Sequence, residues 1–287
     1  MKLVESAGLI ATSFRSLPPF ELHRPAGAEA AARLAASLPR SAYFAGGTDL
    51  VAQYNEGWSA DHVIDLSRLK FLRRIERQCD ALLIGALVTH WNGARSRKVR
   101  GALPGFAAAW ARIANVRVRM AATLGGNLMA RRTRYESPVL LSAAGATLEF
   151  VTAAGPLSMP VSAFLASGAP ASALLESVRI PLLPGMRFDY ERSPRPIATQ
   201  ALALWAGDEG RPAGRVALAT EHVFPKVLDL DLSGYASLAE VRGDAHTIAA
   251  RSFEALPADF ADPVTGNAWL RRAGAVLLSR QLKRTAW

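Results

Sequence analysis

The sequence is poor in cysteine and lacks the residue spacings of a metal centre. Cys79 is the single cysteine among 287 residues, so the chain cannot form an internal disulfide. It also cannot hold an iron–sulfur cluster, which takes about four ligands, or a cysteine-rich zinc site. The five histidines are scattered without the spacing of a metal motif. The sequence therefore predicts no metal site, and we interpret Cys79 as a structural or surface thiol.

Long apolar runs and several enzyme motifs are also absent. No segment reaches the roughly 20 apolar residues that span a bilayer. Glu5 and Gly8 interrupt the apolar start, so we expect no signal peptide and a cytoplasmic location. The chain has neither the G-x-G-x-x-G of Rossmann folds nor the G-x-x-x-x-G-K-[ST] of P-loops. No Ser-His-Asp spacing supports acyl transfer.

The composition is that of an ordinary globular protein with an excess of basic residues. Half of the residues are hydrophobic and the formal net charge is +10. Lys and Arg are scattered, with one dense stretch at 95–134, and no nucleic-acid-binding module accompanies them. We therefore interpret the charge as a basic surface and expect no nucleic-acid partner. The length favours one large domain or two moderate ones.

Two glycine pairs are the most informative feature of the chain. They lie in AGGTDL at 45–50 and in TLGGN at 123–127, each between hydrophobic segments. Paired glycines let the backbone turn tightly and present amide N–H groups to an anion. A helix capped by Thr48 or Asp49 would add a positive end. Either loop alone fits a plain strand–turn–helix junction, but the two together indicate binding of an extended diphosphate.

The hydrophobic pattern predicts an α+β protein with a larger N-terminal part and a smaller C-terminal sheet packed with helices. Pro181 and Pro184 mark the boundary between them. Helices are expected at 26–38, 48–54, 104–114, 138–144, 246–255 and 267–284, and Thr89 is placed to cap another. Strands are expected at 42–44, 62–66, 82–88, 146–152 and 174–181, and as a hairpin at 197–205 and 215–223.

The order of these motifs resembles the FAD-binding medium subunits of molybdenum hydroxylases, the group that includes carbon monoxide dehydrogenase and the xanthine dehydrogenases. The family pattern is A-G-G-[THS]-[DS]-L after a strand, I-D-L, I-G-A, then [TS]-[IL]-G-G-N after a helix, and an acidic residue before P-x-L-L. The matching segments are 44–50, 64–66, 84–86 with 89–90, 122–127, and Glu136 before 138–141.

The resemblance implies a fold related to vanillyl-alcohol oxidase, of the PCMH type, with FAD held between two α/β subdomains. It places the FAD-binding domain at 17–181, with subdomains at about 17–66 and 67–181, after an N-terminal extension at 1–16 that the family pattern does not explain. A small C-terminal α+β domain at 185–287 would contain a three-stranded antiparallel sheet and helices.

The resemblance also implies a set of FAD contacts. Both glycine loops would hold the diphosphate, largely through backbone amides, and Glu136 would accept hydrogen bonds from ribose hydroxyls. Residues near Ile113 and near Leu175 would approach the flavin or adenine, although both also fit an ordinary core. The expected cofactor-binding residues are Ala45, Gly46, Gly47, Thr48, Asp49, Leu50, Ala114, Ala122, Thr123, Gly125, Gly126, Asn127, Glu136 and Leu175. No catalytic residue is expected on this chain.

The implied function is electron transfer within a heteromeric enzyme. A large subunit would carry molybdopterin, and a small subunit would carry two [2Fe–2S] clusters. The FAD on this chain would pass electrons to NAD, a quinone, a carrier protein or oxygen. Two alternatives stay open, namely a standalone FAD-dependent oxidase and an FAD-free structural subunit of the same complex.

The sequence departs from the family pattern at two places. Arg131, Arg132 and Arg134 occupy a loop that is usually neutral or acidic. This loop fits a solvated basic segment, a contact to the flavin or diphosphate, or a docking site for an acidic partner. The family also often has a lysine early in the C-terminal domain, and here Tyr190 or Arg192 is the candidate to replace it.

Overall fold

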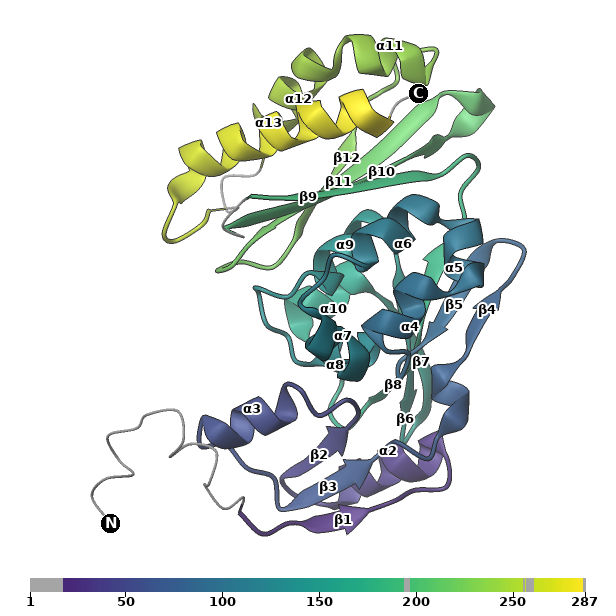
Figure 1. The fold of residues 1–287 in the computed structure, drawn as a ribbon, viewed down its shortest axis with the longest axis vertical. Coiled ribbons are helices and arrows are strands. Elements are labelled where there is room, and N and C mark those ends of the chain that lie inside the picture. Colours follow the sequence, from purple (N-terminus) through teal and green to yellow (C-terminus); the bar gives the residue numbers. More distant parts are fainter. Residues whose placement is uncertain (1–17, 194–196, 255, 257–260, 286–287) are drawn as a thin grey trace.

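The computed structural model describes residues 18–193, 197–254, 256 and 261–285, which form three sheets with attached helices. The sheets follow one another along the long axis of the molecule, with the three-stranded sheet at one end and the four-stranded sheet at the other (Figure 1). The expected extension at 1–16 lies outside the described residues. No helix in the described ranges combines the length and apolarity needed to cross a bilayer.

The first sheet is parallel, in the order β1-β3-β2. Its strands are β1 (Glu21–His23), β2 (Ser41–Phe44) and β3 (His62–Asp65). Helix α2 (Ala28–Ser37) joins β1 to β2, and α3 (Leu50–Asn55) lies between β2 and β3. The alanine-rich sequence of α2 favours a helix, and its buried alanines pack in the same hydrophobic cluster as Ile64 of β3.

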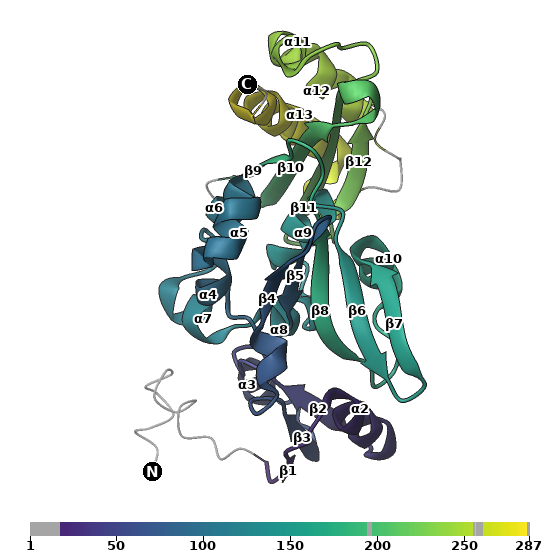
Figure 2. The same ribbon diagram turned by 90° about the vertical axis from the view of Figure 1, so that its right-hand side faces the viewer.

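The second sheet is antiparallel, in the order β4-β5-β8-β6-β7. Its strands are β4 (Ile75–Arg77), β5 (Ala81–Gly85), β6 (Thr147–Thr152), β7 (Gly155–Pro160) and β8 (Leu174–Pro181). Short helices pack beside it, with α4, α5, α6 and α7 forming one layer (Figure 2). These helices are η2 (Lys70–Arg73), α4 (His90–Arg95), α5 (Arg97–Ala102), α6 (Pro104–Trp110), α7 (Val116–Ala121), α8 (Leu124–Met129), α9 (Ser137–Ala143) and α10 (Val161–Ser167).

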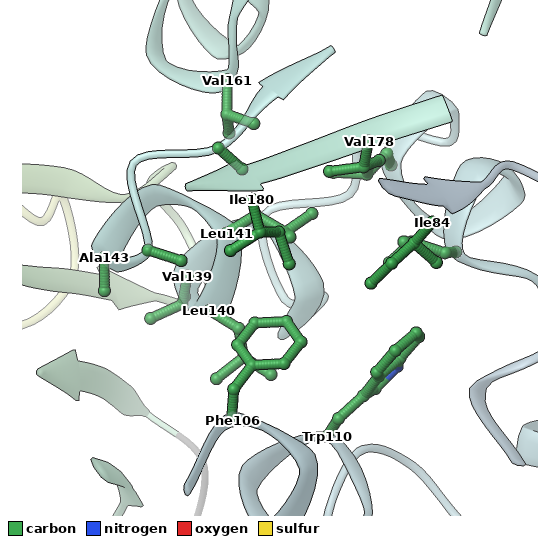
Figure 3. Close-up of a cluster of buried hydrophobic side chains, with 14 of the residues drawn as sticks. Ile84, Phe106, Trp110, Val139, Leu140, Leu141, Ala143, Val161, Val178 and Ile180 are labelled. Atoms are coloured by element: carbon green, nitrogen blue, oxygen red, sulfur yellow. The ribbon is translucent and has the colours of Figure 1, made fainter. Parts of the chain in front are cut away.

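The main core lies between this sheet and its helices. Phe106 and Trp110 of α6 point towards Ile84 of β5, and Leu140 and Ile180 are close by (Figure 3). These side chains are almost fully buried, and burial of large apolar side chains is the main favourable term in folding. The core therefore holds α6 and the chain that follows it at a fixed position relative to β5.

The third sheet is antiparallel, in the order β12-β11-β10-β9, and corrects the expectation of three strands. Its strands are β9 (Arg187–Arg192), β10 (Ala198–Ala206), β11 (Pro212–Thr220) and β12 (Lys226–Leu230). The described part of this region also contains η3 (Asp208–Gly210), α11 (Leu238–Gly243), α12 (Ala245–Glu254) and α13 (Gly266–Thr285). The expected hairpin is the central pair β10 and β11. On β9, Phe188 and Tyr190 are buried and alternate with charged residues, a pattern typical of a strand.

Candidate functional site

A cavity of about 600 Å³ lies where the first sheet meets the second sheet and its helices. Its volume is in the range of about 300–1,000 Å³ that is typical of small-molecule sites. Its walls come from β2, the loop before α3, the start of α4, the chain from Ile113 to Glu136, and the start of β8. All the cofactor-binding residues expected from the sequence line this cavity, namely Ala45, Gly46, Gly47, Thr48, Asp49, Leu50, Ala114, Ala122, Thr123, Gly125, Gly126, Asn127, Glu136 and Leu175.

The two glycine loops contact each other at this cavity. A Cβ added to Gly46 would lie only 2.1 Å from the carbonyl oxygen of Ala121, just before the second loop. A Cβ on Gly126 would lie 3.8 Å from that of Ala45. Gly47 has a φ of 73°, which favours glycine. Glycine is therefore required at position 46 because the other loop approaches it closely, whereas the sequence had suggested the approach of a ligand as the reason.

The first loop has backbone amides available for a ligand. Within the described part of the chain, the amides of Gly46, Gly47 and Thr48 donate to no protein acceptor. Helix α3, which follows, has only six residues, so its dipole adds little to these amides. Consecutive amide N–H groups in such a loop form a concave site for an anion.

The second loop uses its amides within the protein. The Gly125 amide donates to the carbonyl of Ala86 at 2.9 Å, and the Gly126 amide donates to Oγ1 of Thr123 at 3.1 Å. The Asn127 amide donates to the carbonyl of Thr123. The side chain of Asn127 is different: the residue lines the cavity, and its Oδ1 atom is buried without a hydrogen-bond partner among the described residues. This loop thus offers a side-chain amide to a ligand, rather than the row of backbone amides that the sequence suggested.

Asp49 stands at the N-cap position of α3 but makes no capping hydrogen bond, so the expected capping role is wrong. Its carboxylate accepts hydrogen bonds from Gln53, from Tyr135 at 2.8 Å and from Nε of Arg132 at 3.0 Å. Burial opposes ionisation of Asp49, but these hydrogen bonds outweigh it and hold the pKa of the carboxyl below its usual value. The negative charge on the first loop is therefore compensated by a neighbouring guanidinium.

The three arginines after the second loop have three different environments. Arg131 donates to the carbonyl of Leu165 at 2.8 Å and lies over the ring of Phe164. Arg132 pairs with Asp49, and Arg134 lines the cavity. The side chain of Arg132 is only 27% exposed, so this segment is not simply a solvated basic loop. Arg134 is the arginine positioned to meet a ligand.

Glu136 connects the cavity to the third sheet. Its carboxylate accepts hydrogen bonds from the hydroxyl of Tyr190, from Nη1 of Arg192 at 3.1 Å and from the Ala114 amide at 3.3 Å. Both side chains proposed to replace the family's lysine thus reach Glu136. An ionised carboxylate offers about four acceptor positions, so capacity remains for a ligand hydroxyl. Burial and the Glu136 charge raise the pKa of Tyr190, which stays a hydrogen-bond donor.

His90 is a cavity residue that sequence reasoning did not single out. Its Nδ1 accepts a hydrogen bond from Nε1 of Trp110 at 2.8 Å, and burial lowers its pKa to about 4. Because the indole can only donate, the neutral imidazole carries its proton on Nε2. Nε2 is buried without a partner among the described residues, and His90 lines the cavity. The sequence signals were its place in the matching family segment 89–90 and its position after the helix cap Thr89, which accepts from the Asn92 amide.

Three of the expected residues have distinct backbone or packing roles. Ile113 and Leu175 are almost fully buried in the main core, as one of the two interpretations expected, and both also line the cavity. Ala114 has a φ of 49°, unusual for a residue with a Cβ. Nη1 of Arg119 donates to the carbonyls of both Ile113 and Ala114, which fixes this turn in the wall of the cavity.

Comparisons with known proteins agree on one family. Residues 18–183 match the family described as "FAD binding domain in molybdopterin dehydrogenase". The chain is 29% identical over 131 residues to the caffeine dehydrogenase subunit beta of Pseudomonas sp. strain CBB1, spanning 45% of this chain and 44% of that protein. It is 27% identical over 222 residues to the carbon monoxide dehydrogenase medium chain of Hydrogenophaga pseudoflava, spanning 74% and 77%.

The fold is also similar to that of solved structures. A chain of quinoline 2-oxidoreductase from Pseudomonas putida 86 superposes with a TM-score of 0.79 at 24% identity, covering 95% of this chain and 98% of that one. Similarity at this identity establishes the α+β architecture. The chain spans less than half the length of the caffeine dehydrogenase subunit that it matches.

Proposed function

The chain belongs to the family of FAD-binding domains of molybdopterin dehydrogenases, and we propose that it is the FAD-binding, electron-transferring subunit of a heteromeric molybdopterin-dependent hydroxylase or dehydrogenase. One observation carries the proposal. Both glycine loops, Glu136 and Leu175 are far apart in sequence, yet they line one cavity of suitable volume. The family relationship gives that cavity its ligand.

The side chains and amides of the cavity fit FAD. The free amides of Gly46, Gly47 and Thr48 suit the oxygens of a diphosphate. The unpartnered Oδ1 of Asn127 and Nε2 of His90 are a buried acceptor and a buried donor. Buried polar atoms without partners are costly and are usually satisfied, so a polar ligand would stabilise both. We assign the ribose hydroxyls to Glu136.

When bound, FAD supplies the redox chemistry, and the protein supplies binding, orientation and electrostatics. The amides of the first loop would hold the cofactor, and Arg134 would add positive charge at the cavity. The pair of Asp49 and Arg132 would keep the first loop from repelling an anion. No side chain of this chain is assigned a proton-transfer step with substrate, since substrate chemistry belongs to another subunit.

The partners follow from the proposed role. A large subunit would carry molybdopterin, and a small subunit would carry the two [2Fe–2S] clusters, for which the single cysteine of this chain provides too few ligands. Carbon monoxide dehydrogenase medium chain and caffeine dehydrogenase subunit beta, both relatives, are named as parts of larger enzymes. We propose NAD, a quinone, a carrier protein or oxygen as the final acceptor, and the cytoplasm as the location.

We propose that the FAD-binding domain comprises residues 17–181, divided near residue 66, and that residues 185–287 form the C-terminal domain. The three sheets support this division, because each is built from a continuous stretch of chain. A fold of the PCMH type, with FAD between the two N-terminal subdomains, is supported by the position of the cavity between the first two sheets.

Co-purification tests this function. The chain, expressed with its genomic neighbours, should be isolated in a complex containing FAD, molybdenum and iron, and the flavin absorbance should bleach when a reducing substrate is added. N-heterocycles, purines, alkaloids, aldehydes and carbon monoxide are the compounds to supply. A flavin-loaded chain that is reduced by substrate without any molybdenum or iron partner would support the standalone oxidase instead. A complex without flavin would support the structural subunit.

A further inference from the structure

Two histidines and a glutamate lie together on the first sheet, and none of the three is among the residues that line the cavity. Glu21 and His23 are on β1, and His62 begins β3. The parallel register pairs Glu21 with His62. Residues i and i+2 of a strand point to the same face, so Glu21 and His23 share a face, and His62 stands beside them. His23 and His62 are 39 residues apart in sequence, which is why no metal motif was visible there.

The three side chains bring their ligand atoms within 4.8 Å of one another. Nε2 of His23 lies 3.1 Å from Nδ1 of His62. The Glu21 carboxylate lies 3.7 Å from Nε2 of His23 through one oxygen and 3.4 Å from Nδ1 of His62 through the other. Zinc–nitrogen and zinc–oxygen bonds of about 2.0–2.2 Å in a tetrahedral site place the ligand atoms roughly 3.3–3.5 Å apart. The nitrogen–nitrogen separation lies just below that value, and the two nitrogen–oxygen separations, each to a different carboxylate oxygen, lie at or just above it.

We propose that Glu21, His23 and His62 form a binding site for a divalent transition metal ion, with zinc as the expected occupant. Imidazole nitrogen suits zinc, copper and nickel, whereas calcium and magnesium prefer ligand sets made of oxygen. Three protein ligands leave a fourth position of the tetrahedron open to water. The proposal does not depend on FAD binding.

The surroundings of the cluster favour a defined site. The two histidine side chains are only 16% and 20% exposed, so their rings are held in place, while Glu21 is 67% exposed and leaves a path for an ion. Among the described residues, Glu21, His23 and His62 are the one set of three or more His, Cys, Asp or Glu side chains whose ligand atoms all lie within 4.8 Å of one another. The ion would join β1, an edge strand of three residues, to the central strand β3.

Metal titration of the full-length chain, without a polyhistidine tag and after treatment with a chelator, tests the site. Zinc, added in competition with a chromophoric chelator, should bind at one ion per chain. His23→Ala and His62→Ala should each weaken this binding by about tenfold or more, and zinc should raise the melting temperature of the wild type but not of these variants. His246→Ala is the matched control, because His246 is exposed on α12 in another sheet's helical layer.

Cobalt provides a readout that does not depend on the variants folding. Tetrahedral Co²⁺ bound by the wild type should absorb in the visible region, and equimolar zinc should abolish this absorbance. Equal zinc affinity in the wild type and both histidine variants would overturn the proposal, as would the absence of zinc binding and of tetrahedral cobalt absorbance in the wild type. The three side chains would then be only a hydrogen-bonded surface cluster.

Discussion

Nε of Arg132 lies 3.0 Å from Oδ1 of Asp49, although 83 residues separate the two in sequence. The pair links the first glycine loop to the segment that follows the second. It also explains how a loop with an acidic residue can face a diphosphate, because the carboxylate is already neutralised. Both side chains are less than one-third exposed, so solvent screens the pair only partly.

Removal of Arg132 should therefore weaken FAD binding. In Arg132→Gln, the Asp49 charge is uncompensated near the diphosphate, and we expect a loss of about 1 kcal/mol, or roughly fivefold in Kd. The double variant Asp49→Asn with Arg132→Gln should recover most of the affinity. Quenching of flavin fluorescence during titration measures both. A double variant as weak as Arg132→Gln alone would show that Arg132 acts by another route.

Gly46 should not tolerate a methyl group. In Gly46→Ala, the new Cβ would lie 2.1 Å from the Ala121 carbonyl oxygen, so the two loops must move apart, at a cost of about 1–3 kcal/mol. We expect lower stability and loss of retained FAD during purification. Gly101→Ala is the matched control, since nothing lies within 4 Å of its added Cβ. Full flavin content in Gly46→Ala would contradict the assigned loop contact.

Glu136 should couple the third sheet to the cavity. Glu136→Ala removes the acceptor for Tyr190, Arg192 and the Ala114 amide, and we expect a loss of about 1–3 kcal/mol in the free energy of unfolding and in FAD binding. Tyr190→Phe should cost about 1 kcal/mol in unfolding. Tyr235→Phe, which removes a phenol bonded to Asp244 at the surface, is the control.

The losses in the free energy of unfolding caused by Glu136→Ala and by Tyr190→Phe should not add. Because Glu136 and Tyr190 share a hydrogen bond, the double variant should be more stable than the sum of the single losses predicts. Chemical denaturation of the four proteins measures this difference. Unchanged FAD affinity in Glu136→Ala would remove Glu136 from the ribose assignment while leaving its structural role intact.

His90 should make stability depend on pH. Burial lowers its pKa to about 4 from 6.5, so the unfolded chain takes up the proton first as the pH falls. The stability due to neutral His90 is complete above pH 6.5 and decreases as the pH falls to about 4, by about 3 kcal/mol. His90→Gln cannot titrate, so the stability advantage of the wild type should shrink over this window. Denaturation at several pH values measures the free energy of unfolding of both proteins. A difference between the wild type and His90→Gln that stays constant from pH 7 to pH 4 would show that His90 is not buried as described.

The local sequence was sufficient to predict the position of a strand or helix where the hydrophobic periodicity and the turn residues agree. The strand at 174–181, the hairpin of β10 and β11 and the long helix α13 were predicted to within a few residues. The hydrophobic pattern placed neither of the outer strands β9 and β12, and the resemblance implied three strands instead of the four observed. These two strands depend on tertiary pairing, because β9 forms its ladder with β10 and β12 forms its ladder with β11.

The detailed roles of site residues depended on contacts across the sequence. Asp49 has the local pattern of a helix cap, but its partner Tyr135 is 86 residues away. The sequence of the second loop suggests a row of free backbone amides, but the Gly125 amide donates a hydrogen bond to the carbonyl of Ala86. Glu136 was identified by its motif, whereas its bond to Tyr190 required the third sheet. Such pairings follow from tertiary packing and carry no local signal.

Equilibrium titration of the purified full-length chain with FAD tests the central claim most directly. The account predicts saturable binding of one FAD per chain, release of intact FAD on denaturation, and loss of binding in Gly46→Ala but not in Gly101→Ala. A folded wild-type chain that does not bind FAD, or equal FAD binding by both variants, would contradict the assignment of the cavity.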